Sequence, residues 1–226
     1  EIGQDLLLDN SAGTKSFLSF SNTAELRVNR DIKFNADTEN RLEIELNDDS
    51  RINLGRTIER GAVKYGRLNC LDNSVLVFGS SDYIQTIPQN TGAGSDNFNY
   101  LNIEINNTKI SAPQLYLEGP VSIPGVLTLN DGIIQTSATN LLTIENTGSI
   151  SGGSEESYIE GPVEITGNSS VAFPVGKNGR YQPLSISAPS SITDGFIAEY
   201  VDENADLLFD IENHDPSLDH IADCEY

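Results

Sequence analysis

The chain contains the hexapeptide Glu118-Gly119-Pro120-Val121-Ser122-Ile123 and, 42 residues later, a near copy, Glu160-Gly161-Pro162-Val163-Glu164-Ile165. This offset equals two turns of about 21 residues, a period typical of a parallel β-solenoid. An aromatic–aliphatic pair precedes each copy, Tyr116-Leu117 and Tyr158-Ile159, and Leu142-Thr143-Ile144 lies midway like a degenerate coil edge. The repeat therefore predicts stacked coils, with Val121 and Val163 in one column of the core.

Short runs of alternating apolar and polar residues recur from Leu26 to Ile165, which indicates strands with one buried and one exposed face. Asn, Asp, Gly and Ser separate the runs, and these residues favour tight turns. A sandwich of short strands would show the same rhythm, but the repeat favours the solenoid. A helical period is absent until 205–211, which is short and acidic.

The pattern changes near residue 168, where longer, antiparallel-looking runs begin, at 170–173, 183–187 and 196–201. We therefore predict an all-β chain in two parts. Residues 1–167 form a right-handed parallel β-solenoid (β-helix), and residues 168–226 form a small antiparallel β-sandwich-like module. We expect residues 202–226 to be the least stable part of the chain, unless a following segment or a partner covers them.

Composition argues against several classes of partner. The 226 residues include 13 Lys and Arg against 34 Asp and Glu, which gives a formal net charge of −21. Such an acidic surface repels nucleic acid and anionic lipid, because binding either requires cationic side chains. No apolar run approaches the ~20 residues that span a bilayer. We expect no nucleic-acid partner and no direct membrane insertion.

From about residue 74 onward, the sequence resembles a repeat region of large surface proteins of Bacteroidota. The resemblance runs through 99–105, 125–136, Ser151-Gly152-Gly153-Ser154, 157–163 and 173–184, about two-thirds of the chain. It implies secretion, commonly by the type IX system, and display at the outer cell surface as an adhesin-like protein. In that family the position of Glu225-Tyr226 is followed by Trp and further strand sequence, which implies a truncated C-terminal module.

Metal and cofactor sites are weakly indicated. Asp202, Asn204 and Asp206 have the i, i+2, i+4 spacing that opens an EF-hand calcium loop, but Leu207 stands where the loop needs Gly and Asn213 where it needs Glu. An exposed acidic loop is the favoured interpretation, and calcium is the one cofactor left open. His214 and His220 lie near carboxylates, but their spacing fits no standard zinc motif.

Catalytic residues are not predicted. Lys177 and Arg180 lie close together, as in some polysaccharide lyases, but they fall in a Gly-rich turn where pairing with a surface carboxylate is ordinary. Cys70 and Cys224 match no metal spacing, and two unrelated thiols are favoured over a disulfide.

The sequence thus predicts a non-enzymatic structural or adhesive segment of a large secreted cell-surface protein, acting as a rigid spacer or interaction surface. Its partners would be other domains of the same protein, and surface glycans or proteins. The alternative is a carbohydrate-binding or carbohydrate-active, polysaccharide lyase-like β-helix module. Glycan binding would need exposed aromatic rings, and the absence of Trp counts against it. The candidate rings are Tyr65, Tyr83, Tyr116 and Tyr158.

Overall fold

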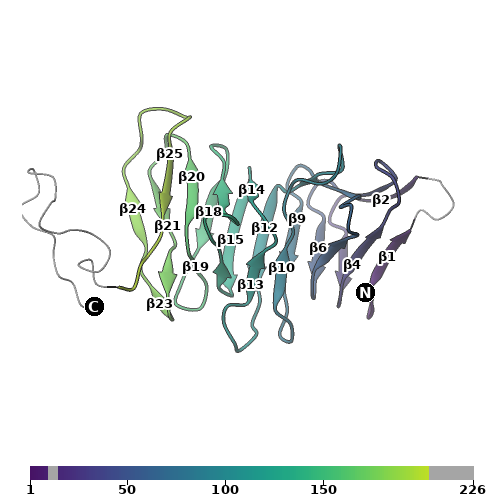
Figure 1. The fold of residues 1–226 in the computed structure, drawn as a ribbon, viewed down its shortest axis with the longest axis horizontal. Coiled ribbons are helices and arrows are strands. Elements are labelled where there is room, and N and C mark those ends of the chain that lie inside the picture. Colours follow the sequence, from purple (N-terminus) through teal and green to yellow (C-terminus); the bar gives the residue numbers. More distant parts are fainter. Residues whose placement is uncertain (10–14, 204–226) are drawn as a thin grey trace, which may run out of the picture.

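The structure is a computed structural model that describes residues 1–9 and 15–203. These residues form 25 β-strands and no helix. In this part of the chain there is accordingly no helix with the length and apolarity to cross a membrane. The strands lie side by side along the long axis of the molecule, from the N-terminal end to the C-terminal end (Figure 1). The predicted all-β parallel solenoid with a small antiparallel part is confirmed.

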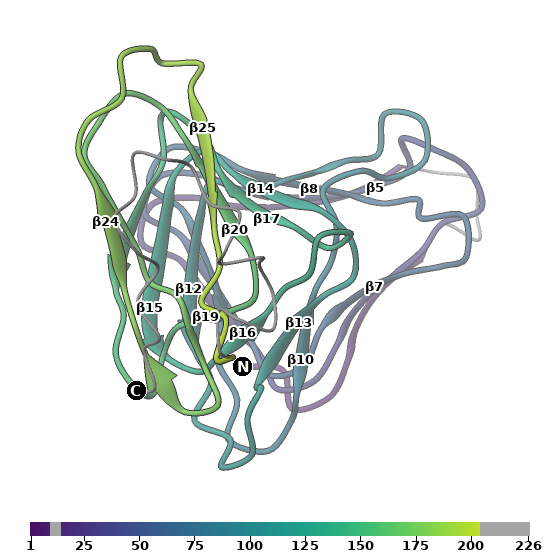
Figure 2. The ribbon, with the colours of Figure 1, turned by 60° about the vertical axis from the view of Figure 1, so that its left-hand side comes forward.

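Each coil has three faces, and the chain visits them in a fixed order (Figure 2). One face is a single six-stranded parallel sheet. Its strands are β3 (Glu25–Val28), β6 (Arg51–Leu54), β9 (Val75–Phe78), β12 (Asn102–Asn106), β15 (Val126–Asp131) and β18 (Ser149–Gly152). Because each coil adds one strand to this sheet, it runs the length of the solenoid.

Each of the other two faces consists of two parallel sheets in succession. The second face contains β1 (Leu6–Asp9), β4 (Ile32–Asn35) and β7 (Ile58–Arg60), then β10 (Gln85–Ile87), β13 (Leu115–Leu117), β16 (Ile134–Gln135) and β19 (Ile159–Glu160). The third contains β2 (Ser16–Phe20), β5 (Leu42–Leu46), β8 (Arg67–Cys70) and β11 (Phe98–Asn99), then β14 (Val121–Ile123), β17 (Leu142–Ile144) and β20 (Val163–Thr166).

Inward-pointing side chains stack into columns because the strands pair in register. On the six-stranded face Ile52 pairs with Leu76, Leu76 with Ile103, and Ile103 with Leu127. All four side chains are fully buried. Burial of such a side chain is worth about 1.5–3 kcal/mol, so each column contributes substantially to stability. The solenoid therefore has one continuous hydrophobic core.

The repeat occupies the position that the sequence predicts. Val121 pairs with Leu142 and Leu142 with Val163, so the two copies lie two coils apart in one column. The step of 21 residues holds between these strands, but it is wrong for the six-stranded face. There Ile52 and Leu76 are 24 residues apart, because loops of different length join the faces.

Strand pairing changes from parallel to antiparallel after β20, near the predicted boundary at residue 168. The antiparallel pairs are β20 with β25 (Gly195–Ala198), β21 (Val171–Phe173) with β24 (Leu184–Ile186), and β22 (Gly176–Lys177) with β23 (Arg180–Tyr181). The strand β25 extends the solenoid's third face, and Val175 still pairs with Ile159 in parallel. Residues 204–226 of the predicted module lie outside the described residues.

Loops in the first coils project from the corner between the second and third faces (Figure 2). The fully buried carboxylate of Asp96 joins them by accepting hydrogen bonds from the backbone N–H groups of Asn40 (3.0 Å) and Gly66 (3.1 Å). The Arg60 guanidinium lies 3.9 Å from the centroid of the Phe98 ring. Desolvation lowers the pKa of Arg60 from its ordinary value. These polar groups therefore organise the loops.

Candidate functional site

Asp202, the first residue of the predicted calcium triad, serves as an anchor for a hairpin. Its carboxylate accepts hydrogen bonds from Asn178 (3.1 Å) and Arg180 (3.2 Å), and from the Tyr200 hydroxyl (3.4 Å). The hydrogen bond from Asn178, followed by the charge of Arg180, lowers the Asp202 pKa. Residues 1–9 and 15–203 contain no group of three or more His, Cys, Asp or Glu that could hold a metal. Asn204 and Asp206 lie outside the described residues, so calcium binding stays a prediction, as it does for His214 and His220.

The basic pair Lys177 and Arg180 lies on the β22–β23 hairpin, where the two residues are direct cross-strand neighbours. Arg180 forms an ion pair with Asp202 at 3.2 Å. This is the ordinary surface pairing expected for a Gly-rich turn. The arrangement fixes the hairpin to the chain that follows β25.

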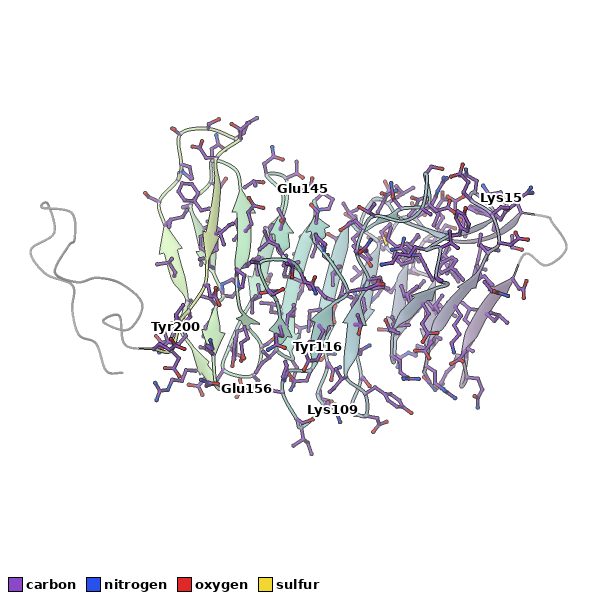
Figure 3. The ribbon with its side chains drawn as sticks, in the orientation of Figure 1. Lys15, Lys109, Tyr116, Glu145, Glu156 and Tyr200 are labelled. Carbon is purple, nitrogen blue, oxygen red and sulfur yellow. The ribbon has the colours of Figure 1, made fainter. Side chains whose placement is uncertain are left out.

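The four candidate tyrosines do not form one aromatic surface. Tyr158 is fully buried, and its hydroxyl accepts a hydrogen bond from the backbone N–H of Gly179 (3.0 Å), so the expectation that it could stack on a sugar is wrong. Arg56 lies 5.0 Å from the Tyr83 ring centroid, and Tyr65 is half-buried. Tyr116 projects outward from β13 (Figure 3). Tyr83 and Tyr116 are thus the exposed rings among the four, with 40% and 37% of their surfaces exposed, and they lie on different segments.

Cys70 is a buried free thiol at the end of β8. Desolvation raises its pKa to about 12. A thiol with this pKa carries almost no thiolate near neutral pH, and the thiolate is the nucleophilic form. Cys70 is therefore part of the core.

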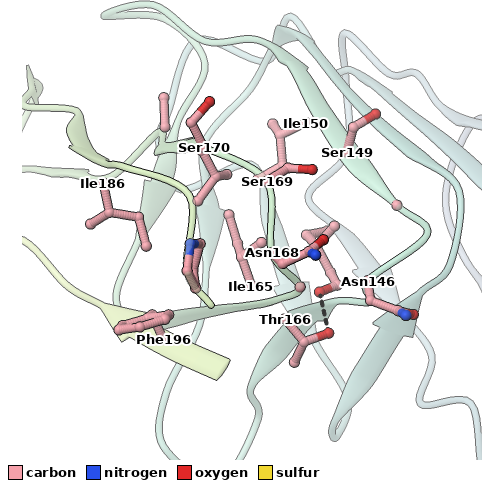
Figure 4. A pocket seen from close by; sticks show the side chains of 16 residues that line it. Asn146, Ser149, Ile150, Ile165, Thr166, Asn168, Ser169, Ser170, Ile186 and Phe196 are labelled. Atoms are coloured by element: carbon pink, nitrogen blue, oxygen red, sulfur yellow. Dashed lines mark hydrogen bonds between the residues drawn. The ribbon is translucent and has the colours of Figure 1, made fainter. Parts of the chain in front are cut away.

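A pocket of about 280 Å³ lies at the C-terminal end of the solenoid (Figure 4). It opens where the six-stranded face ends at β18. In a regular further coil, β21 would pair with β18, but β21 pairs with β24 instead. The space between β18 and the β21–β24 pair is therefore not filled by any strand of residues 1–9 and 15–203.

The lining of the pocket combines an apolar floor with a neutral polar rim. Ile144 and Ile165, from the last positions of a core column, lie at its base, and Phe196 from β25 forms a wall. The rim carries the side chains of Asn146, Ser149, Asn168, Ser169 and Ser170. None of the 16 lining residues is charged.

The pocket was missed by reasoning from sequence. The sequence reads 146–148 as an ordinary turn, and Asn168-Ser169-Ser170 coincides with the end of the alternating pattern. The end of the alternating apolar–polar pattern at 168–170 is the one feature of the sequence that coincides with the pocket. A chain that stops extending one face while it continues the other two leaves a gap at the end of the core.

Comparison of the chain with protein-family models, curated proteins and solved structures gives no match.

Proposed function

We propose that this chain is a structural and adhesive segment of a large secreted cell-surface protein, and that it acts as a rigid spacer or presenting surface. The observation that carries the proposal is the continuous parallel pairing of the six-stranded sheet from β3 to β18, with one register shift at the Ile105–Asn106 end of β12. Each coil contacts its two neighbours and shares one core with them, so the coils resist bending as a unit. A stiff rod suits a segment that holds another domain away from a surface.

The outward side chains support a role at a water-exposed surface. On the six-stranded face these positions include Asn53, Glu104 and Thr128, in register between the buried columns. Ion pairs join coils that are two apart, as between Arg51 of β6 and Glu104 of β12 (2.7 Å) and between Lys64 and Glu118 (2.8 Å). The net charge of −21 favours solubility and opposes self-association. Glycans or proteins at the cell surface are the proposed partners.

A non-enzymatic role is part of the proposal, because the most buried carboxylates have structural partners. Asp31 accepts hydrogen bonds from Arg56 (3.1 Å) and from the backbone N–H of Thr57 (3.2 Å). Asp96 joins the projecting loops. A general acid or base needs a carboxyl group that can reach a substrate. These two groups are committed to the fold.

Two measurements test the proposal. Small-angle X-ray scattering should give a rod-like profile that is the same at low and high salt, since a packed core sets its length. Protease treatment of intact source cells should release peptides of this chain if it is displayed at the surface. A profile that changes with salt would overturn the rigid-spacer role, and peptides released only after lysis would overturn surface display.

A further inference from the structure

We propose that the pocket between β18, β20 and the β21–β24 pair binds one neutral sugar unit of a glycan. The inference goes beyond the spacer role and does not depend on it. Among the residues that the structure describes, the lining has three properties that carry the inference: no charged side chain, an apolar floor with an aromatic wall, and a rim of amides and hydroxyls most of which have no hydrogen-bond partner there.

The absence of charge selects a neutral ligand. The 226-residue chain contains 47 charged residues, the sum of 13 basic and 34 acidic ones, yet none of those within 1–9 and 15–203 lines the pocket. A carboxylate, phosphate or ammonium group placed here would lose water without gaining an ion pair, which is costly. Uronic acids and other ionised ligands are therefore disfavoured relative to neutral hexoses.

The floor and wall suit the apolar face of a sugar ring. Ile144 and Ile165 are buried at the base, and Ile150 of β18 is half-buried beside them. The Phe196 side chain is 42% exposed, although it faces the Cα position of Ile165 across the β20–β25 pair. An exposed aromatic ring next to aliphatic side chains offers a surface for the C–H groups of a pyranose.

The rim suits hydroxyl groups. The side chains of Asn146, Asn168, Ser169 and Ser170 make no hydrogen bond to any residue in 1–9 or 15–203. Each amide provides one acceptor and two donors, and each hydroxyl both donates and accepts. Thr166 is different, because its hydroxyl already donates to the carbonyl of Ile144 (3.4 Å, Figure 4). The free groups can bond sugar hydroxyls that point away from the floor.

The geometry of the gap explains why this pocket is present at one end of the solenoid. Within the solenoid each coil covers the core of the preceding one, as β15 pairs with both β12 and β18. At the end, β20 and Val175 continue two faces while β21 departs from the third. The site therefore lies at the end of the described part of the six-stranded face, beside the antiparallel strands.

Saturation-transfer NMR on the full chain tests the proposal. The probes are the methyl glycosides of glucose, galactose, fucose and N-acetylglucosamine, with methyl glucuronide as the charged comparison. We expect saturation of ring C–H protons for at least one neutral glycoside, with an affinity in the range of about 1 mM that is usual for weak sites. Asn168→Ala and Phe196→Ala should each weaken binding by about fivefold or more.

Phe17→Ala is the matched control, because Phe17 is a 52% exposed aromatic residue on β2, at the opposite end of the solenoid. It should leave binding unchanged. Asn168 is exposed in a loop, so Asn168→Ala keeps the test valid even if Phe196→Ala disturbs β25. The proposal is overturned if no neutral glycoside binds, if the glucuronide binds more tightly, or if Asn168→Ala has no effect. Scattering that still gives a rigid rod would leave the spacer role standing.

Discussion

Val121 and Val163 lie in one column of the core, two coils apart, and Leu142 pairs with both of them. The three side chains are almost completely buried. Leu142 thus lies between the two copies of the Glu-Gly-Pro-Val motif and contacts the valine of each. The column explains why the motif tolerates a change at its fifth position, Ser122 to Glu164, which points outward.

Truncation of the middle residue of this column should be strongly destabilising. Leu142→Ala removes side-chain volume that both neighbouring coils enclose, and we expect a loss of about 2–5 kcal/mol in the free energy of unfolding. Urea denaturation followed by circular dichroism measures it. Val126→Ala is the control, because Val126 is 36% exposed on β15, and should change stability by no more than about 0.5 kcal/mol. Equal losses for the two variants would contradict the continuous core.

The two motif glycines should respond differently to the same substitution. Gly161 has a φ of +118°, and an added Cβ would lie 2.6 Å from the backbone carbonyl oxygen of Thr136. At Gly119 the added Cβ would first meet the flexible side chain of Gln89, 2.5 Å away. Gly161→Ala should therefore cost about 1–3 kcal/mol and Gly119→Ala clearly less. Thermal unfolding of the two variants compares them, and the reverse order would refute the difference in backbone conformation.

The sequence predicts the column of Val121, Leu142 and Val163 because the spacing of apolar residues and the positions of turn residues are local features of the chain. Register within a coil is not local, and Tyr116 and Tyr158 show the consequence. Their motif-relative positions match, but Tyr116 lies in the same column position as Glu160, so Tyr116 points outward while Tyr158 is buried. The paired residues Leu115 and Ile159 are 44 apart, two more than the motif offset of 42, so Tyr158 falls just before β19 rather than within it. There the β22–β23 hairpin covers it, and the backbone N–H of Gly179 donates to its hydroxyl (3.0 Å).

The pocket could not be predicted for a similar reason. It depends on which strand pairs with β21, because β18 and β24 each offer an edge to which β21 could add. Alternation of apolar and polar residues identifies Val171–Phe173 as a strand but does not select its neighbour. The choice is made by tertiary packing at the end of the core, where Val171 and Ile186 pack together against it.

Cys70 should resist thiol reagents as long as the chain is folded. Its raised pKa, about 12, and its burial on β8 both suppress the thiolate. In a Cys224→Ser variant, which leaves one thiol, Ellman's reagent at pH 8 should react at the rate of unfolding. In concentrated urea the reaction should be immediate. Fast stoichiometric reaction in native buffer would contradict the buried position.

The hairpin anchored by Asp202 should loosen in acid. Because the folded-state pKa of Asp202 is lowered, its stabilising effect is present above the ordinary value of 3.8 and is lost as the pH falls through the lowered value. Amide exchange in β22 and β23, followed by NMR against pH, should therefore rise in this window. Asp202→Asn should remove the pH dependence, whereas Glu199→Gln, at an exposed neighbouring position, should leave it in place.

Protection from hydrogen exchange should fall from the solenoid to its antiparallel end. The strand β17 lies between β14 and β20, so both its edges and its core face are covered. Among the described strands, β25 pairs only with β20, and its Phe196 and Ile197 side chains are exposed. Detachment of β25 therefore exposes little additional apolar surface and breaks only its backbone hydrogen bonds to β20.

Amides of β25 should consequently exchange at least about 100-fold faster than those of β17, since regions with few buried contacts open locally while a core strand opens only on global unfolding. The control is β6, which lies between β3 and β9 and should match β17. Most of 202–226, which we expect to be the least stable segment, lies outside the described residues. Hydrogen exchange of its amides measures that stability in the same experiment. Equal protection of β25 and β17 would mean that the antiparallel strands unfold together with the solenoid, and that the end of the core is held as firmly as its middle.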